Sequence, residues 1–98
     1  MRQVHVYVIG DVIGVGFRAW TKIQAKDLQV NGWVRNVHDK EHVFGRGGGV
    51  EAIFQGTEYQ LNQMIQRIKA GPSIARVDDV EVYWQEVKDI FPSFEIRK

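Results

Sequence analysis

The sequence predicts an α+β fold, a split βαββαβ sandwich whose antiparallel sheet carries two helices on one face. Segments of strand and helix periodicity follow one another as strand, helix, strand, strand, helix, strand. Right-handed crossovers leave a gap beside the first strand, which the third strand fills antiparallel. The length of 98 residues suits one core, so we expect a single domain over residues 1–98.

The first half of the chain has the pattern of a strand, a helix and a second strand. Apolar residues alternate along Val4 to Gly10, which is the two-residue period of a strand. From Phe17 to Leu28 apolar residues recur at helical spacing, which predicts an amphipathic helix of about three turns. Trp33 to Val37 is then expected to form the second strand.

The second half begins with a strand from Val50 to Phe54. Thr57 and Gln60 have the spacing of a capping box, and an apolar stripe at helical offsets follows them, which predicts the second helix. Gly71 and Pro72 end this helix. Two further strands are expected at Val77 to Val87 and at Phe94 to Arg97.

Composition limits the function. The formal net charge of +1 lacks the basic excess of a domain that contacts many phosphates, so we expect no nucleic acid partner. The chain has no cysteine, which excludes disulfides and a thiolate nucleophile. No apolar run approaches membrane-spanning length and no signal-peptide core follows Met1, so we expect a cytoplasmic protein without a membrane partner.

The segment from Gly10 to Arg18 joins the first strand to the first helix. It places three glycines ahead of one arginine, so several backbone N–H groups can converge where a helix N-terminus adds partial positive charge. Phosphate suits such a site, because an arginine fork adds charge and two-pronged geometry. The spacing alone leaves open that Gly14 and Gly16 only permit a tight turn and that Arg18 is a solvated surface residue.

Asn36 is expected near the same segment. The first and second strands run in the same direction in the predicted topology, so the loops that follow them lie at the same end of the sheet. Asn36 stands at the end of the second strand and approaches the glycine-rich turn.

Four motifs extend over nearly the whole chain in consistent order. They are Gly10-x-Val12-x-Gly14-Val15-Gly16-Phe17-Arg18, Ala25-x-x-Leu28-x-Val30-x-Gly32-Trp33-Val34-Arg35-Asn36, Val50-Glu51-Ala52 with Phe54 and Gly56, and Gly71-Pro72-x-x-Ala75-x-Val77. Together these motifs resemble the acylphosphatase family, which implies a ferredoxin-like sandwich.

The resemblance implies a metal-independent hydrolase, without a cofactor, that cleaves the carboxyl-phosphate anhydride of a small-molecule acyl phosphate. Arg18 would bind the phosphoryl group and Asn36 would orient the attacking water. We expect no metal site, since His5, His38 and His42 form no ligand cluster. We also expect a monomer. The phosphate-binding segment implied by the resemblance comprises Ile13, Gly14, Val15, Gly16, Phe17 and Arg18.

The sequence departs from the family pattern near this segment. Ile13 stands where a glutamine is usual, and Asp11 puts an acid beside the anion site, so Asp11 must point away from it. Gln29 replaces the usual glycine at a left-handed helix cap, which could cost about 1 kcal/mol.

The loop from His38 to Gly49 is longer than the turn that is usual in the family. We expect a disordered insertion. The alternative is a mobile flap with glycine hinges, from which Arg46 or His42 reaches the substrate.

Two other functions are compatible with this predicted fold. One is a non-catalytic acylphosphatase-like domain that recognises phosphate, and the other is an RNA-binding sandwich, which the low net charge disfavours. The presence of both Arg18 and Asn36 favours catalysis, because a phosphate-binding domain has no evident need for the asparagine.

Overall fold

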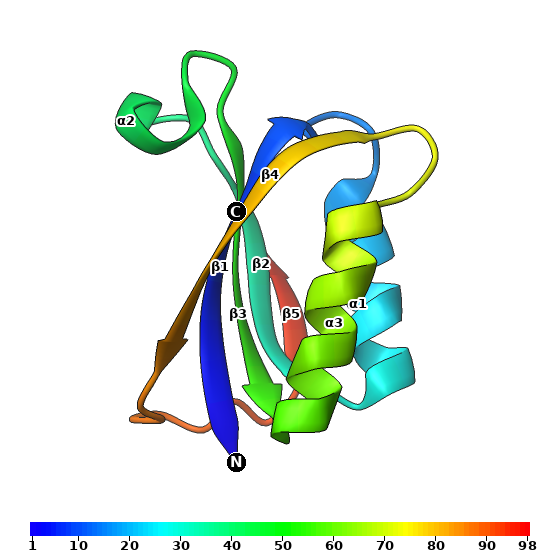
Figure 1. The fold of residues 1–98 in the computed structure, drawn as a ribbon, viewed down its shortest axis with the longest axis vertical. Coiled ribbons are helices and arrows are strands. Elements are labelled where there is room, and N and C mark those ends of the chain that lie inside the picture. Colours follow the sequence, from blue (N-terminus) through cyan, green and yellow to red (C-terminus); the bar gives the residue numbers. More distant parts are fainter.

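The computed structural model describes residues 1–98, which form a five-stranded sheet covered on one face by two long helices (Figure 1). A third, short helix lies on the other side of the sheet. In chain order the elements are β1 (Arg2–Asp11), α1 (Phe17–Leu28), β2 (Asn31–Val37), α2 (Glu41–Phe44), β3 (Gly49–Gly56), α3 (Glu58–Ala70), β4 (Arg76–Gln85) and β5 (Phe94–Arg97).

The sheet has the strand order β4-β1-β3-β2-β5. β3 lies antiparallel between β1 and β2, as the split βαββαβ prediction requires, and the predicted fold class is confirmed. One detail differs, because β5 pairs in parallel with β2 and makes the sheet mixed rather than purely antiparallel. The cause is the connection after β4, which carries the chain from one edge of the sheet to the other.

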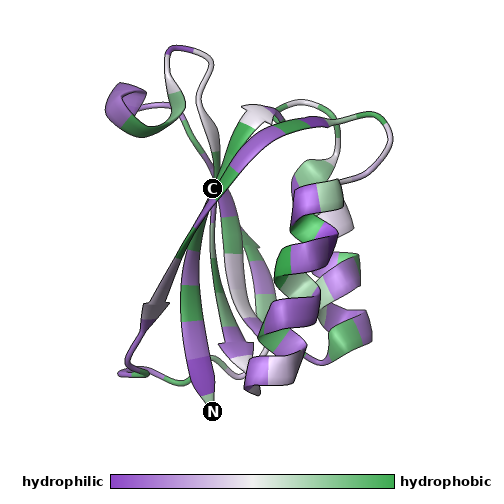
Figure 2. Cartoon of the chain, viewed as in Figure 1, coloured by the Kyte–Doolittle hydropathy of each residue, from purple (hydrophilic) through white to green (hydrophobic).

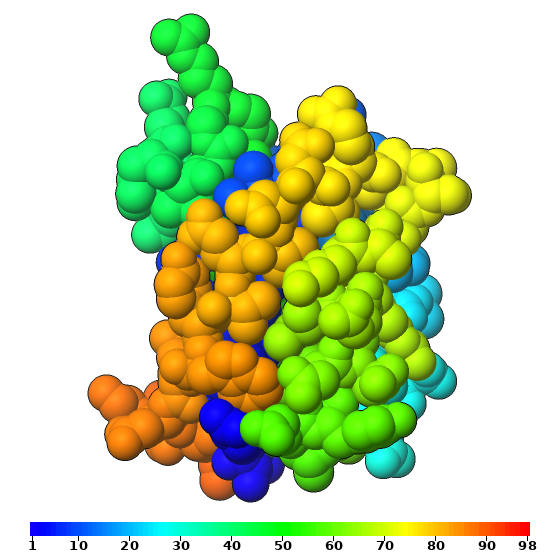
Figure 3. Space-filling model, in the orientation of Figure 1, coloured from blue at the N-terminus to red at the C-terminus, as the bar shows by residue number.

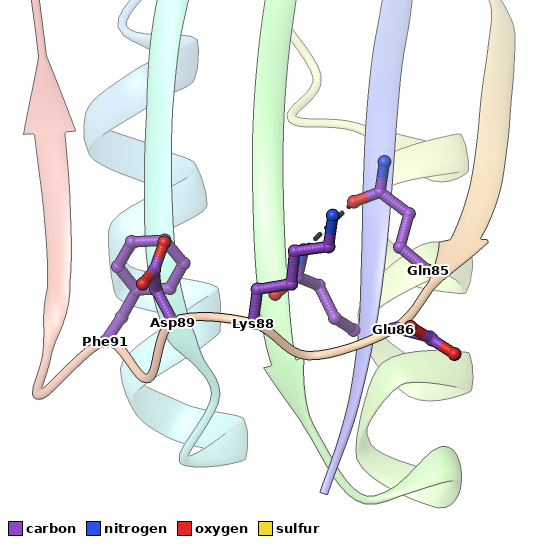
Figure 4. Close-up of a pocket in the computed structure, with 6 residues that line it drawn as sticks. Gln85, Glu86, Lys88, Asp89 and Phe91 are labelled. Atoms are coloured by element: carbon purple, nitrogen blue, oxygen red, sulfur yellow. Dashed lines mark hydrogen bonds between the residues drawn. The ribbon is translucent and has the colours of Figure 1, made fainter.

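Residues 86–93 form that connection (Figure 4). Gln55, 2% exposed, holds them by donating from Nε2 to the carbonyl of Asp89 at 2.6 Å and accepting from the amide of Phe91 at 3.0 Å. The side chain of Asn31 donates to the carbonyl of Phe91 at 3.1 Å. These bonds bring the chain to the outer side of β2, where β5 begins.

The core lies between the sheet and the helices α1 and α3. Alternate residues of β1 point into it, and the hydropathy of the strands alternates accordingly (Figure 2). The capping box of α3 is confirmed: Thr57 Oγ1 accepts from the Gln60 amide at 3.2 Å and Gln60 Oε1 accepts from the Thr57 amide at 2.7 Å. The helix ends at Gly71, as predicted.

The loop between β2 and β3 contains a helix, so the expectation of a disordered insertion is wrong. Phe44 of α2 is only 7% exposed, and its ring lies edge-on to that of Tyr7 at a centroid distance of 5.5 Å. Burial of this ring against β1 outweighs the low intrinsic stability of a four-residue helix. The loop projects beyond the end of the sheet (Figure 3).

Glu51 is buried on the sheet face opposite α1 and α3, with its side chain 6% exposed. Its carboxylate lies 2.5 Å from His5 Nε2 and accepts from Arg35 Nε at 2.7 Å. Burial by itself would raise the pKa of Glu51, but the hydrogen bonds from His5 and Arg35 outweigh burial and hold this pKa below its ordinary value.

Replacing Glu51 with glutamine is expected to reduce the free energy of unfolding by about 2 kcal/mol at pH 7, because a charged hydrogen-bond acceptor is lost. The folded-state pKa lies below the ordinary value of 4.5, so the stabilisation is complete above about pH 5 and is lost as the pH falls through the folded-state pKa. Urea titrations from pH 3 to pH 7 should therefore show the difference between parent and Glu51→Gln shrinking toward acid. Glu58→Gln, at a 62% exposed side chain, is the control and should change little. A difference independent of pH would contradict the proposed charge effect.

Gln29 ends α1 in the left-handed conformation, with φ 58° and ψ 40°. Gln29→Gly is expected to raise the free energy of unfolding by about 1 kcal/mol, since glycine adopts this conformation without the Cβ clash. That gain corresponds to an increase of about 4–8 °C in the melting temperature of a chain of this size. Gln29→Ala keeps the Cβ and should show no such gain. Equal melting temperatures for the two variants would count against strain at this cap.

Candidate active site

The turn from β1 to α1 depends on two left-handed glycines. Gly14 has φ 80°, and Gly16, at the N-cap position of α1, has φ 76° and ψ 18°. For residues other than glycine, this conformation costs about 1 kcal/mol or more. No side chain caps the helix, so its first amides point into the turn without a local acceptor.

The backbone amides of this turn form the first half of the site. Among the hydrogen bonds formed by loops, turns and caps, none is donated by an amide from Ile13 to Arg18. Amides at the N-terminus of a helix carry partial positive charge and are suited to bind an anion. The turn therefore has donors for several oxygens of one anion.

A pocket of about 170 Å³ opens beside these amides. Arg18 projects from the first turn of α1, and its Nη1 makes only a long contact of 3.4 Å with the carbonyl of Arg97. None of the salt bridges in the structure involves Arg18, so most of its donors remain available for a bound anion. The residues lining the pocket are Val12, Gly14, Gly16, Phe17, Arg18, Ala19, Asn36 and Ile96.

Asn36 reaches the pocket because of its register in β2. It lies opposite Val50 of β3 and two residues beyond the buried Val34, so it points to the face of the sheet that α1 covers. Arg35, between them, points to the other face and binds Glu51. The structure thus brings the side-chain amide of Asn36 to the same pocket as Arg18, across 18 positions of sequence.

The predicted site residues divide into two groups. Gly14, Gly16, Phe17, Arg18 and Asn36 line the pocket together. Ile13 and Val15 belong to the same turn, but their side chains do not line the pocket, so any part they take in binding comes from their amides.

Sequence reasoning missed three lining residues: Val12, Ala19 and Ile96. Val12 and Ala19 flank predicted residues and could have been found by extending the motif on each side. Ile96 could not have been found in this way. It lies in β5 opposite Val34, and its position follows from the parallel pairing of β5 with β2.

Three residues that the sequence suggested could affect anion binding lie outside the pocket. Asp11 is exposed, pairs in register with Arg76 of β4 and does not line the pocket. His42 and Arg46 are exposed in the loop before β3 and do not line the pocket. The structure therefore does not support a flap that brings His42 or Arg46 to the substrate.

A larger crevice of about 470 Å³ lies at the other end of the sheet (Figure 4). Its side-chain amides already pair with one another, since Gln3 Nε2 donates to Gln85 Oε1 at 2.9 Å and Gln3 Oε1 accepts from Gln55. No arginine lines it. The crevice is lined by Gln3, Gln85, Glu86, Lys88, Asp89 and Phe91.

The fold and the pocket define a class of protein: a small α+β sandwich with a candidate anion site at its first strand-to-helix turn. No helix in the structure has both the length and the apolar character needed to cross a membrane.

Comparison with known proteins identifies the family. The family model described as Acylphosphatase matches residues 4–96. An acylphosphatase of Chloroflexus aurantiacus is 44% identical over 84 residues, which cover 86% of this chain and 83% of the relative. The crystal structure of acylphosphatase from Bacillus subtilis matches with a TM-score of 0.88 and 30% identity over 100% of both chains. The chain belongs to the acylphosphatase family, which confirms the resemblance seen in the sequence and the prediction of an enzyme.

The same fold also occurs inside a much longer protein. A crystal structure of full-length HypF in a phosphate- and nucleotide-bound form matches 99% of this chain with a TM-score of 0.84 and 26% identity. The match covers only 12% of that protein.

Proposed function

We propose that the chain hydrolyses acyl phosphates in the pocket between Arg18 and Asn36, and that the amides of Ile13 to Arg18 bind the phosphoryl oxygens together with the Arg18 guanidinium. The observation that carries this proposal is the convergence of acceptor-free amides, one unpaired arginine and one asparagine amide on a single pocket. Family membership supports the reaction, and the geometry supports the roles of the residues.

The reaction requires little covalent chemistry from the protein. The water oxygen attacks phosphorus, the bond from phosphorus to the acyl oxygen breaks, and the carboxylate departs with the electron pair. A carboxylate is a good leaving group, so catalysis consists mainly of holding water in line and stabilising charge on the phosphoryl oxygens. No covalent nucleophile and no metal is part of this proposal.

Arg18 and the amides would stabilise the phosphoryl group by complementary means. The amides are fixed by the turn and lose no freedom when the anion binds, while the guanidinium supplies a full charge and two parallel donors. Both remain directed at the phosphoryl oxygens as the bond to the leaving group lengthens, which is where charge must be stabilised.

Asn36 would position the water rather than deprotonate it, since an amide is a poor base. Its oxygen can accept from the water while its NH₂ group donates to a phosphoryl oxygen. The proton released by the water would pass to a phosphoryl oxygen of the substrate, so the step balances without a separate protein base.

The alternative of a phosphate-recognising domain without activity is not favoured. Binding alone would be served by Arg18 and the amides, and the curated relatives carry the name of the enzyme. We retain as proposals from the sequence that the chain is one domain over residues 1–98, acts as a cytoplasmic monomer and has no nucleic acid or membrane partner. The net charge of +1 supports the absence of a nucleic acid partner.

Hydrolysis of benzoyl phosphate, measured with EDTA and without added metal, tests the proposal. Arg18→Ala should lower kcat/KM by about 100-fold or more, because the charge on the phosphoryl oxygens loses its main cation. Asn36→Ala should lower kcat by about 100-fold while the inhibition constant Ki of inorganic phosphate changes little, because the water is lost but the anion site remains.

Arg46→Ala is the matched control. It removes an exposed arginine from the neighbouring loop, outside the pocket, and should keep kcat/KM within about twofold of the parent. Parent activity no higher than that of Arg18→Ala and Asn36→Ala would overturn the enzymatic proposal. Retained phosphate binding in that case would support the non-catalytic alternative.

A further inference from the structure

Ile13 contacts the long loop between β2 and β3. A Cβ placed on Gly48 would come within 3.1 Å of Ile13 Cδ1, so the backbone of this loop lies directly against the Ile13 side chain. Ile13 is half-buried and does not line the pocket, although its amide belongs to the phosphate-binding turn. The loop therefore touches the turn from outside the pocket.

Gly48 is itself held closely. It is buried, and a Cβ on it would lie 2.5 Å from the carbonyl oxygen of Val37 at the end of β2. At the next residue, Gly49, a Cβ would overlap the ring of Phe44. Phe44 thus packs against the residue that directly follows Gly48.

Phe44 fixes the loop to the sheet. Its ring meets the Tyr7 ring edge-on at 5.5 Å, on the face opposite α1 and α3. Tyr7 is in turn packed between His5, at a ring distance of 4.7 Å, and Tyr83, at 6.1 Å. Contacts thus run from Tyr7 of β1 through Phe44 to Gly49, and the preceding residue, Gly48, lies against Ile13. We call Tyr7, Phe44, Gly48 and Ile13 the brace.

We propose that the brace holds the phosphate-binding turn in its binding-competent conformation, with Phe44 as a positioning residue that acts through Gly48 and Ile13. The inference rests on the proposed function, because it concerns the same anion site. It assigns a role to the long loop that differs from a flap, since no side chain of the loop needs to reach the substrate.

The physical reason lies in the composition of the turn. Its amides make no hydrogen bonds within the protein, and its two glycines have access to many conformations. The turn is therefore held by side-chain contacts, those of Val15 with the core and of Ile13 with the loop. When only a fraction of molecules is competent, the apparent dissociation constant rises by the inverse of that fraction. External contacts that raise the fraction therefore increase phosphate affinity.

Phe44→Ala should raise both the Ki of inorganic phosphate and the KM for benzoyl phosphate by about fivefold, as expected if the turn without the brace is competent in about one molecule in five. The value of kcat should stay within about twofold, because a bound phosphoryl group orders the turn before chemistry. Phe44→Leu keeps apolar bulk against Tyr7 and should restore most of the affinity.

Ile65→Ala is the control for a general loss of stability. Ile65 is 7% exposed, as Phe44 is, but lies in α3 and does not line the pocket. The melting temperature of the Ile65→Ala variant should fall, while its Ki for phosphate stays at the parent value. A melting curve of each variant checks that the folded state is populated at the assay temperature.

Ile13→Ala provides a second route to the same test. It removes the other end of the contact and should raise Ki by a similar factor, and the double variant with Phe44→Ala should add little more, because the two residues act through one contact. A Ki unchanged in Phe44→Ala, or a lower kcat with unchanged KM and Ki, would overturn the brace. If the proposed function itself were wrong, Arg18→Ala would retain the parent activity. This variant therefore distinguishes failure of the proposed function from failure of the brace.

Discussion

The site depends on a run of backbone amides that the protein leaves without acceptors. The chain passes from β1 to α1 through two left-handed glycines, and no side chain caps the helix, so the amides from Ile13 to Arg18 remain free. Free donors of this kind are tolerated where water or an anion can reach them. The turn therefore offers its free donors to the anion in the proposed site.

The sheet determines what stands beside those amides. Because β1 and β2 each pair antiparallel with β3, they run in the same direction and end at the same end of the sheet. Asn36 reaches the pocket from the end of β2, and Ile96 reaches it from β5, the neighbour of β2. No reactive side chain is required there, since positioning and charge stabilisation are sufficient for a substrate with a good leaving group.

Local signals account for most of what the sequence predicted correctly. Thr57 with Gln60 predicts the start of α3 and Gly71 its end, because capping depends on residues close in sequence. The left-handed cap at Gln29 was expected from the family resemblance, because a glycine is usual at this position, and it is present at φ 58°. Arg18 and Asn36 were identified by motif and topology, and both line the pocket, although their roles stay predictions.

What the sequence could not predict depends on contacts between distant residues. The parallel position of β5 requires Gln55 to anchor residues 86–93, a contact that no local pattern indicates. Helix α2 is stabilised by the packing of Phe44 against Tyr7, which is 37 positions away in the sequence. A glycine-rich loop with a single aromatic residue has a composition typical of disordered segments. The loop is ordered because that aromatic side chain packs on a surface formed by residues distant in sequence.

Two departures from the family pattern, Ile13 and the long loop, are physically related. An isoleucine beside an anion site exposes apolar surface where the family usually has a glutamine, at a cost of about 25 cal/mol per Å² left in water. Gly48 covers part of that side chain, in the loop that leaves β2 at Val37 and enters β3 at Gly49. The intervening residues must form a compact excursion with its own anchor, which α2 and Phe44 provide. The loop thus packs against Tyr7 through Phe44 and against Ile13 through Gly48, so one insertion both anchors itself and covers the apolar side chain beside the turn.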